Sequence, residues 1–226
     1  NWMQVGSDID GEAAGDQSQS VSVSADGSVV AIGAQYNDQN GDSSGHVRIY
    51  QNDNGTWTQI GDDIDGESAN DGSGTSLSLS SDGSVVAIGA QYNDGNGNDS
   101  GHVRIYQLDN NSWTQIGDDI DGEAKYDYSG RSVSLSADGS IVAIGASGNI
   151  SSRGHVRIYQ KSSSVNIPEN TTAVSTYTVT DADAGDTVSW SLTGDDASLF
   201  EINSSGELTF KSAPDYENPL GGANDD

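Results

Sequence analysis

A repeat of 56 residues is the feature of this sequence that most limits how the chain can fold. The motif SADGSVVAIGA and its two close copies start 56 residues apart, at Ser24, Ser80 and Ser136. A second motif, GHVRIYQ, recurs at Gly45, Gly101 and Gly154. Self-similarity at a near-constant period indicates that one structural unit is stacked several times along the chain.

Each repeat contains four short runs that are typical of β-strands. In the second repeat these runs are Ser76–Ser80, Val85–Ala90, His102–Gln107 and Trp113–Gly117. Their apolar residues are mainly β-branched or aromatic and alternate with polar ones, and an Asp-Gly pair predicts a tight hairpin between the first two runs. Four antiparallel strands in a repeat of this length are typical of a β-propeller blade. We therefore expect an all-β fold made of such four-stranded blades.

The run Val85–Ala90 is nearly continuous in apolar residues. Such a strand is expected to be buried on both faces, here between two neighbouring blades. The small Gly and Ala at its end would allow the blades to pack closely.

The composition excludes several classes of function. With 35 acidic and 8 basic side chains the net charge is -27, which argues against nucleic acid and anionic membranes as partners. The absence of cysteine excludes disulfides, zinc-thiolate sites and cysteine nucleophiles. No apolar run approaches the ~20 residues of a membrane-spanning helix. The GxSxG and HExxH motifs and nucleotide-binding loops are also absent, so we expect no enzymatic activity.

Residues 1–160 resemble three repeats of the FG-GAP family of β-propeller blades. The segment Tyr128–Ala146 and the GHVRIYQ motif that follows carry this resemblance. The family's glycine positions are matched by Ser129-Gly130, Gly145-Ala146 and Gly154. The resemblance implies an extracellular or cell-surface protein. Calcium-binding members have an Asp-rich loop between their first two strands, but here each such loop has one Asp, too few for a calcium shell. These residues are Asp26, Asp82 and Asp138.

The first residues of the chain have the sequence of an outer strand. The run Trp2–Gly6 matches Trp57–Gly61, whereas the third repeat lacks such a run after its GHVRIYQ motif. Residues 2–6 could therefore complete the third blade. Known propellers have at least four blades, so further blades upstream or association between copies of the chain are the alternatives.

The pattern changes after the third repeat. We interpret Lys161–Ser164 as a linker, and the alternation in residues 165–226 predicts part of a β-sandwich. The motifs IPEN, TDADAGD, SGELTF and APDYE, in this order, resemble the front part of a bacterial cadherin-like domain. That resemblance implies bound calcium, with ligands at the positions that match the family motifs. These are Glu169, Asp181, Asp183, Asp215 and Glu217.

Other recurring polar residues have simpler interpretations. The histidines would be held apart by the blade repeat, so we expect local hydrogen bonds instead of a metal ring, and the arginines are expected to pair with loop aspartates. The acidic loop Asp62–Glu67 and its copy Asp118–Glu123 resemble partial calcium loops, but a capped turn is favoured over a cation. The histidines are His46, His102 and His155, and the arginines are Arg48, Arg104 and Arg157.

Taken together, the sequence predicts a non-enzymatic adhesion or interaction module, whose partners are other surface proteins or glycans. Propeller repeats would present loops, and the cadherin-like part would make the module calcium-dependent. A glycan-binding propeller is the first alternative, with Trp57 and Trp113 as sugar platforms, although their repetition in register favours packing. A lactonase- or lyase-like propeller enzyme is the second alternative.

Overall fold

The computed structural model describes residues 1–148, 153–162, 172–176 and 197–213. The chain divides into two compact units, Asn1–Lys161 and Ser162–Asp226. In the described ranges both units consist of β-strands, and the one helical element is a short 3-10 helix, η1 (Ala197–Leu199). No helix in these ranges is long and apolar enough to cross a membrane. The expected all-β fold class is confirmed.

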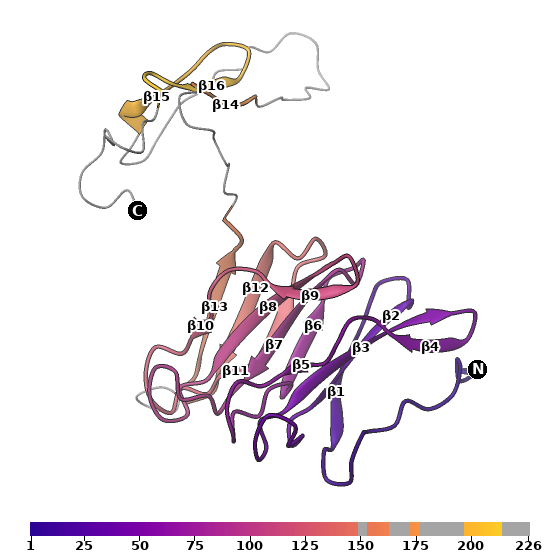
Figure 1. The fold of residues 1–226 in the computed structure, drawn as a ribbon. Coiled ribbons are helices and arrows are strands. Elements are labelled where there is room, and N and C mark those ends of the chain that lie inside the picture. Colours follow the sequence, from indigo (N-terminus) through magenta and orange to yellow (C-terminus); the bar gives the residue numbers. More distant parts are fainter. Residues whose placement is uncertain (149–152, 163–171, 177–196, 214–226) are drawn as a thin grey trace. The chain divides into compact units, whose positions relative to one another are not determined.

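Three antiparallel sheets, one for each repeat, make up the first unit (Figure 1). The first consists of β1 (Ser18–Val23), β2 (Val29–Ala34), β3 (His46–Asp53) and β4 (Thr56–Gln59), in that spatial order. The second contains β6 (Ser76–Leu79), β7 (Val85–Ala90), β8 (His102–Asp109) and β9 (Ser112–Gln115). The third contains β11 (Ser129–Leu135), β12 (Ile141–Ala146) and β13 (His155–Gln160). A four-stranded antiparallel meander of this kind is the blade of a β-propeller.

The acidic loops form two short strands that the sequence pattern did not predict. Strand β5 (Ile64–Asp65) pairs with the start of β3, and β10 (Ile120–Asp121) pairs with the start of β8. The outer strands β4 and β9 pair only with the later parts of β3 and β8. Each acidic loop therefore stays with its own sheet for two residues before the chain passes to the next repeat.

The hairpin between the first two strands of each sheet is closed by its single aspartate. Asp26 accepts hydrogen bonds from the hydroxyls of Ser24 and Ser28, at 2.7 and 2.8 Å, and from the Ser28 N–H at 2.9 Å. These donors stabilise the ionised carboxylate and lower the pKa of Asp26 to about 2. The same turn recurs at Asp82 and Asp138. These carboxylates are therefore used within the turn.

The hydrophobic core lies between consecutive sheets. All six residues of β7 are buried, as expected for a strand covered on both faces, whereas β2 and β12 have residues that are only partly buried or exposed. In the first interface, Leu77 and Leu79 of the second sheet pack in one cluster with Val47 and Ile49 of the first. The middle sheet is thus the only one of the three that is covered from both sides.

Serines on the first strand of the first two sheets bind the next repeat. The hydroxyl of Ser78 accepts the Leu135 N–H at 3.0 Å, and Ser76 donates to the Gly130 carbonyl at 2.7 Å. The hydroxyl of Ser22 accepts the Leu79 N–H in the same way, also at 3.0 Å. Because side chains alternate between the faces of a strand, the serines face the following repeat and the intervening leucines face the preceding one.

A glycine near the end of the second strand in the first two sheets, β2 and β7, allows consecutive sheets to approach closely. A Cβ atom on Gly89 would lie 2.0 Å from the carbonyl oxygen of Gly130 in the next repeat. Gly33 has the corresponding contact with Gly74, where the distance would be 2.3 Å. The expectation that small residues permit close blade packing is confirmed at both interfaces.

Residues 2–6 do not complete the third sheet, in contrast to one expectation from the sequence. They form no strand, and the Val5 carbonyl instead accepts a hydrogen bond of 2.9 Å from the indole of Trp57. Figure 1 shows the N-terminus beside β4, on the other side of the unit from β13. The segment is kept there because it leads directly into Asp10, whose carbonyl is bound by Arg48 of the first sheet.

The described part of the second unit is a small antiparallel sheet. Its strands are β14 (Ala173–Thr176), β15 (Phe200–Ile202) and β16 (Glu207–Phe210), in the order β14-β16-β15. The rings of Phe200 and Phe210 lie 4.4 Å apart between centroids. The other residues of the expected sandwich lie outside the described residues.

The close approach of Gly89 can be tested by replacing it with alanine. We expect Gly89→Ala to lower the free energy of unfolding by about 1–3 kcal/mol, because the added methyl group overlaps a backbone oxygen that cannot rotate away. The measurement is urea denaturation of the full chain, followed by circular dichroism.

Gly145→Ala is the matched control for this substitution. In the third sheet the nearest atom to a Cβ at Gly145 is the Ser132 hydroxyl, and no atom of another repeat lies within 4 Å among the nearest contacts. This control should cost clearly less, because a hydroxyl can change rotamer. Equal losses in both variants would contradict the proposed role of the contact.

Candidate functional site

An arginine on the third strand of each sheet binds the acidic loop that arrives from the preceding repeat. Arg104 donates to the Asp65 carbonyl at 2.7 Å, and its other terminal nitrogen lies 3.5 Å from a Glu67 carboxylate oxygen. The side chain is buried and its guanidinium lies over the Tyr106 ring. The sequence predicted pairing with loop aspartates, but the structure shows the Asp carbonyl and the Glu carboxylate as partners. The corresponding contacts join Arg48 to Asp10 and Glu12, and Arg157 to Asp121 and Glu123.

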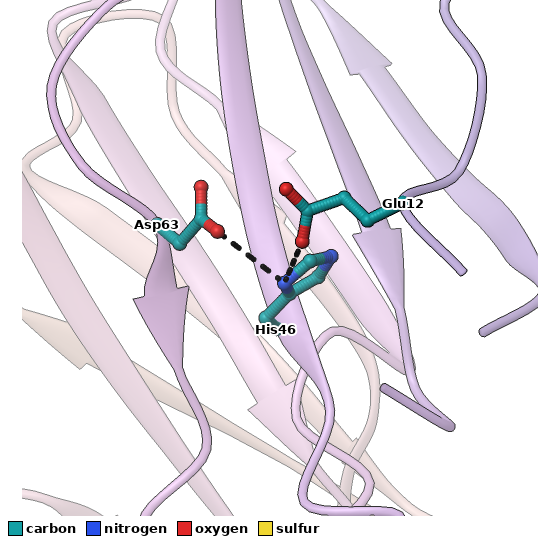
Figure 2. Close-up of side chains that lie close together, drawn as sticks. All are labelled: Glu12, His46 and Asp63. Carbon is teal, nitrogen blue, oxygen red and sulfur yellow. Dashed lines mark ion pairs between the residues drawn. The ribbon is translucent and has the colours of Figure 1, made fainter. Parts of the chain in front are cut away.

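In the first two sheets, a buried histidine two residues before the arginine faces carboxylates from two different loops. Figure 2 shows His46 between Glu12 and Asp63. Its Nδ1 lies 3.7 Å from Glu12 Oε2 and 3.8 Å from Asp63 Oδ2, which is too long for hydrogen bonds. Only 1% of the His46 side chain is exposed, and its Nδ1 has no hydrogen-bond partner.

The same arrangement recurs one repeat later. His102 Nδ1 lies 3.8 Å from Glu67 Oε2 and 3.6 Å from Asp119 Oδ2. Burial, together with the nearby Arg104 guanidinium, lowers the pKa of His102 to about 4 against the opposing effect of Asp119. The imidazole is therefore neutral at neutral pH and can offer a nitrogen lone pair.

A third group, in the third repeat, has a different composition. It consists of Glu123, Asp127 and His155, with His155 Nε2 at 3.8 Å from Glu123. In each of the three groups the potential ligand atoms lie within 4.8 Å of one another, so each has a geometry that could hold a metal ion. We refer to the groups around His46 and His102 as the first and second junction clusters.

Negative charge exceeds positive charge around these clusters. Burial raises the pKa of Asp65, and repulsion by Asp63 raises it further. Burial also raises the pKa of Glu67, with additional repulsion from Asp119. One oxygen of Asp65 is buried without a hydrogen-bond partner. The junction between repeats is thus a place where a cation would be stabilised.

The acidic loop does not act as one partial calcium loop. Asp63 contributes to the first junction cluster, whereas Glu67, only four residues later, contributes to the second. The repeat spacing predicted that the histidines lie far from one another, but it did not predict that each of the first two faces these acids. One sequence feature could have indicated this pairing: the histidine and the acidic loop each recur once per repeat. If they meet at one junction between repeats, the same contact can form at the next.

The calcium ligands expected from the cadherin-like resemblance cannot be placed. Glu169, Asp181, Asp183, Asp215 and Glu217 all lie outside the described residues.

The two repeated tryptophans pack between consecutive repeats. The Trp113 indole N–H donates to the Ile60 carbonyl at 2.9 Å, as Trp57 does to Val5. A cavity of about 220 Å³ beside Trp113 is also lined by Tyr106, Asp63 and Asp65. Its counterpart beside Trp57, of about 330 Å³, is lined by the matching residues Tyr50, Asp8 and Asp10. The tryptophans therefore have a packing role and also border a recurring cavity.

No protein-family model and no curated protein matches the sequence. Among solved structures, the chain is similar to a protein from Bacteroides uniformis described as a 6-phosphogluconolactonase (TM-score 0.46, 16% identity, 67% of this chain and 38% of that one). It is also similar to the periplasmic gluconolactonase of Pseudomonas aeruginosa (TM-score 0.43, 18% identity, 62% of this chain and 38% of that one). A third similar structure is the hydrazine synthase of Kuenenia stuttgartiensis (TM-score 0.40, 14% identity, 71% of this chain and 41% of that one).

The chain thus spans less than half the length of these three proteins. At such identities and TM-scores the likeness does not bear on activity. The blade-type architecture is shown by the repeated four-stranded sheets themselves.

Replacing Arg104 tests whether the arginine contacts hold consecutive repeats together. We expect Arg104→Met to lower the free energy of unfolding by about 1.5–3 kcal/mol, because a buried, charged hydrogen bond is lost and Glu67 loses its partner. The measurement is urea denaturation of the full chain. Arg153→Met removes the same charge at an exposed position and should change stability little. A loss that is no larger for Arg104→Met than for this control would show that the contact is dispensable.

Proposed function

We propose that this chain is a non-enzymatic interaction module of an extracellular or cell-surface protein, and that its repeats associate with further repeats of the same kind. The observation that carries this proposal is an apolar sheet face at each end of the first unit. The absence of catalytic motifs from the sequence supports it. Membership of the FG-GAP and cadherin-like families belongs to the same proposal.

The contact between the first two sheets inside the unit supports this proposal. Leu77 and Leu79 are each 8% exposed and pack against Val47 and Ile49 of the preceding sheet, which are 0% and 1% exposed. At this interface one repeat therefore contributes a valine and an isoleucine from its third strand. The next repeat contributes the alternating apolar residues of its first strand, and the two sets pack against each other. The two faces are different and complementary.

The same faces are uncovered at the two ends. On β1, Val21 and Val23 occupy the positions of Leu77 and Leu79 and are 67% and 59% exposed. On β13, Val156 and Ile158 occupy the positions of Val47 and Ile49 and are 67% and 71% exposed. The residues at these positions are buried at the first internal interface, whereas at the second Val103 is buried and Ile105, Val133 and Leu135 are partly buried. The two end faces therefore have the apolar residues needed to form such an interface again. The occupant we propose is a second copy of this chain, joined head to tail.

The N-terminal segment of that second copy would also fit the third sheet. In the described residues β13 pairs with β12 alone, whereas β3 and β8 each pair with an outer strand as well. The segment Trp2–Gly6 has the repeat sequence of such an outer strand. Asp8, two residues later, corresponds to Asp63 and would approach the third histidine. The head-to-tail contact would then reproduce both the apolar and the acidic part of an internal junction.

The proposed calcium binding concerns the second unit. The cadherin-like motifs place Glu169, Asp181, Asp183, Asp215 and Glu217 as its ligands. Carboxylates from several loops suit calcium, which takes six to eight oxygen ligands. Calcium would stiffen this part of the module.

Self-association is the direct test of the proposal. Sedimentation equilibrium of the full chain should show oligomers that grow with concentration at physiological ionic strength. High ionic strength should favour them, because the net charge of -27 opposes contact between copies. The variants Val156→Ser/Ile158→Ser and Val21→Ser/Val23→Ser should each be monomeric alone, and a mixture of the two should form dimers and nothing larger.

Tyr126→Ser, an exposed aromatic position outside both end faces, is the control and should associate like the unaltered chain. A chain that stays monomeric at high concentration, or variants that associate normally, would refute the head-to-tail contact.

Glycan binding is the second candidate, and the recurring cavities favour it. An aromatic ring beside carboxylates offers a sugar both an apolar face and hydrogen-bond acceptors. In a glycan array, binding through these cavities should disappear in Trp57→Ala/Trp113→Ala and persist in Trp2→Ala, whose indole is fully exposed. An array without hits, or binding that is unchanged in the double variant, would exclude this candidate.

A further inference from the structure

We propose that the first and second junction clusters each bind one divalent transition-metal ion of the zinc type, so that the ion joins two consecutive repeats. The first cluster is Glu12, His46 and Asp63, and the second is Glu67, His102 and Asp119. This inference does not depend on the proposed interaction function.

The interatomic distances fit a shared ion better than direct contact. The nitrogen–oxygen separations are 3.6–3.8 Å, beyond hydrogen-bond range. Around a tetrahedral zinc ion with ligand bonds of roughly 2.0–2.2 Å, neighbouring ligand atoms lie about 3.3–3.6 Å apart. The nitrogen and each oxygen would need to approach by only a few tenths of an ångström, and all three ligand atoms of a cluster lie within 4.8 Å of one another.

The buried nitrogen of His46 is independent evidence for a ligand. Its side chain is 1% exposed, and the Nδ1 atom points between Glu12 and Asp63 without a hydrogen-bond partner (Figure 2). Burying a polar atom without a partner is unfavourable, and native structures rarely tolerate it. A bound ion would satisfy this atom and both carboxylates together.

The surrounding charges also favour a cation. Three carboxylates, those of Glu12, Asp63 and Asp65, lie around His46, and the nearby positive side chains are Arg48 and Arg104, so negative charge is in excess. Arg48 lies 3.7 Å from Glu12 Oε1, which is the oxygen that does not face the histidine. The arginine thereby orients Glu12 and leaves its Oε2 available to the ion.

The ligand atoms of each cluster, one imidazole nitrogen and two carboxylate oxygens, indicate which metals would bind. Calcium and magnesium take oxygen ligands, whereas a neutral imidazole beside two carboxylates suits zinc and related transition metals. Glu12 and Glu67 are 40% and 44% exposed, so solvent can reach each cluster and provide a fourth ligand. This class differs from the calcium proposed for the second unit.

Two ions are expected for each unassociated chain, because the third group is built differently. Asp127, its second carboxylate, is 2% exposed and already accepts the Ala124 N–H at 2.9 Å. No residue of the described chain corresponds there to Asp63 or Asp119.

The test is calorimetric titration of the metal-free full chain with zinc. We expect two saturable equivalents, one equivalent in His46→Gln, one in His102→Gln and none in the double variant. Glu12→Gln should also lose one equivalent. Because Glu12 is partly exposed, this variant should fold even if a histidine variant does not, and it then tests the first cluster in its place. Zinc should raise the melting temperature of the unaltered chain and not that of the double variant.

Matched controls separate these sites from general attraction to an acidic surface. Asp62→Asn and Asp118→Asn remove exposed carboxylates next to Asp63 and Asp119 and should leave both zinc equivalents intact. Calcium should neither displace zinc nor lose binding in His46→Gln, whereas Asp215→Asn/Glu217→Gln should affect calcium alone. Absence of saturable zinc binding, or two equivalents retained in the double histidine variant, would overturn the proposal.

Discussion

The burial of one repeat's face by the next is the interaction on which the rest of the structure depends. A single four-stranded sheet of this size cannot cover either of its faces, so each repeat gains a core only from its neighbours. The middle strand β7 shows the result, because all its residues are buried. The glycine contacts set how closely the sheets approach, and the serine hydrogen bonds fix one sheet against the next.

The polar residues of the repeat are concentrated where sheets meet. Burying Arg104 at the junction would be costly if it lacked partners, and the acidic loop of the preceding repeat supplies them. The loop can do so because β5 first holds it to its own sheet. Structural integrity and possible ion binding therefore depend on the same few residues, so substitutions at the junction need separate readouts for stability and for metal.

The sequence predicted the strands well because their pattern is local. The bounds expected for Val85–Ala90 are those observed, and the other strands of that repeat agree within a few residues. The junction clusters were missed for a physical reason: Glu12 and His46 are distant in sequence, and only the stacking of sheets brings them together. The placement of residues 2–6 failed likewise, because the strand pattern does not show that Trp57 and Arg48 hold this segment at the first sheet.

Each junction is assembled from the end of one repeat and the third strand of the next, in the same way each time. A gene duplication or deletion of one 56-residue unit would therefore create or remove a complete junction and leave the others intact. The segment that is duplicated or deleted is therefore also the segment that packs as one sheet. Such a chain can change its length in whole steps over evolutionary time, without the compensating substitutions that a closed single-core domain would require.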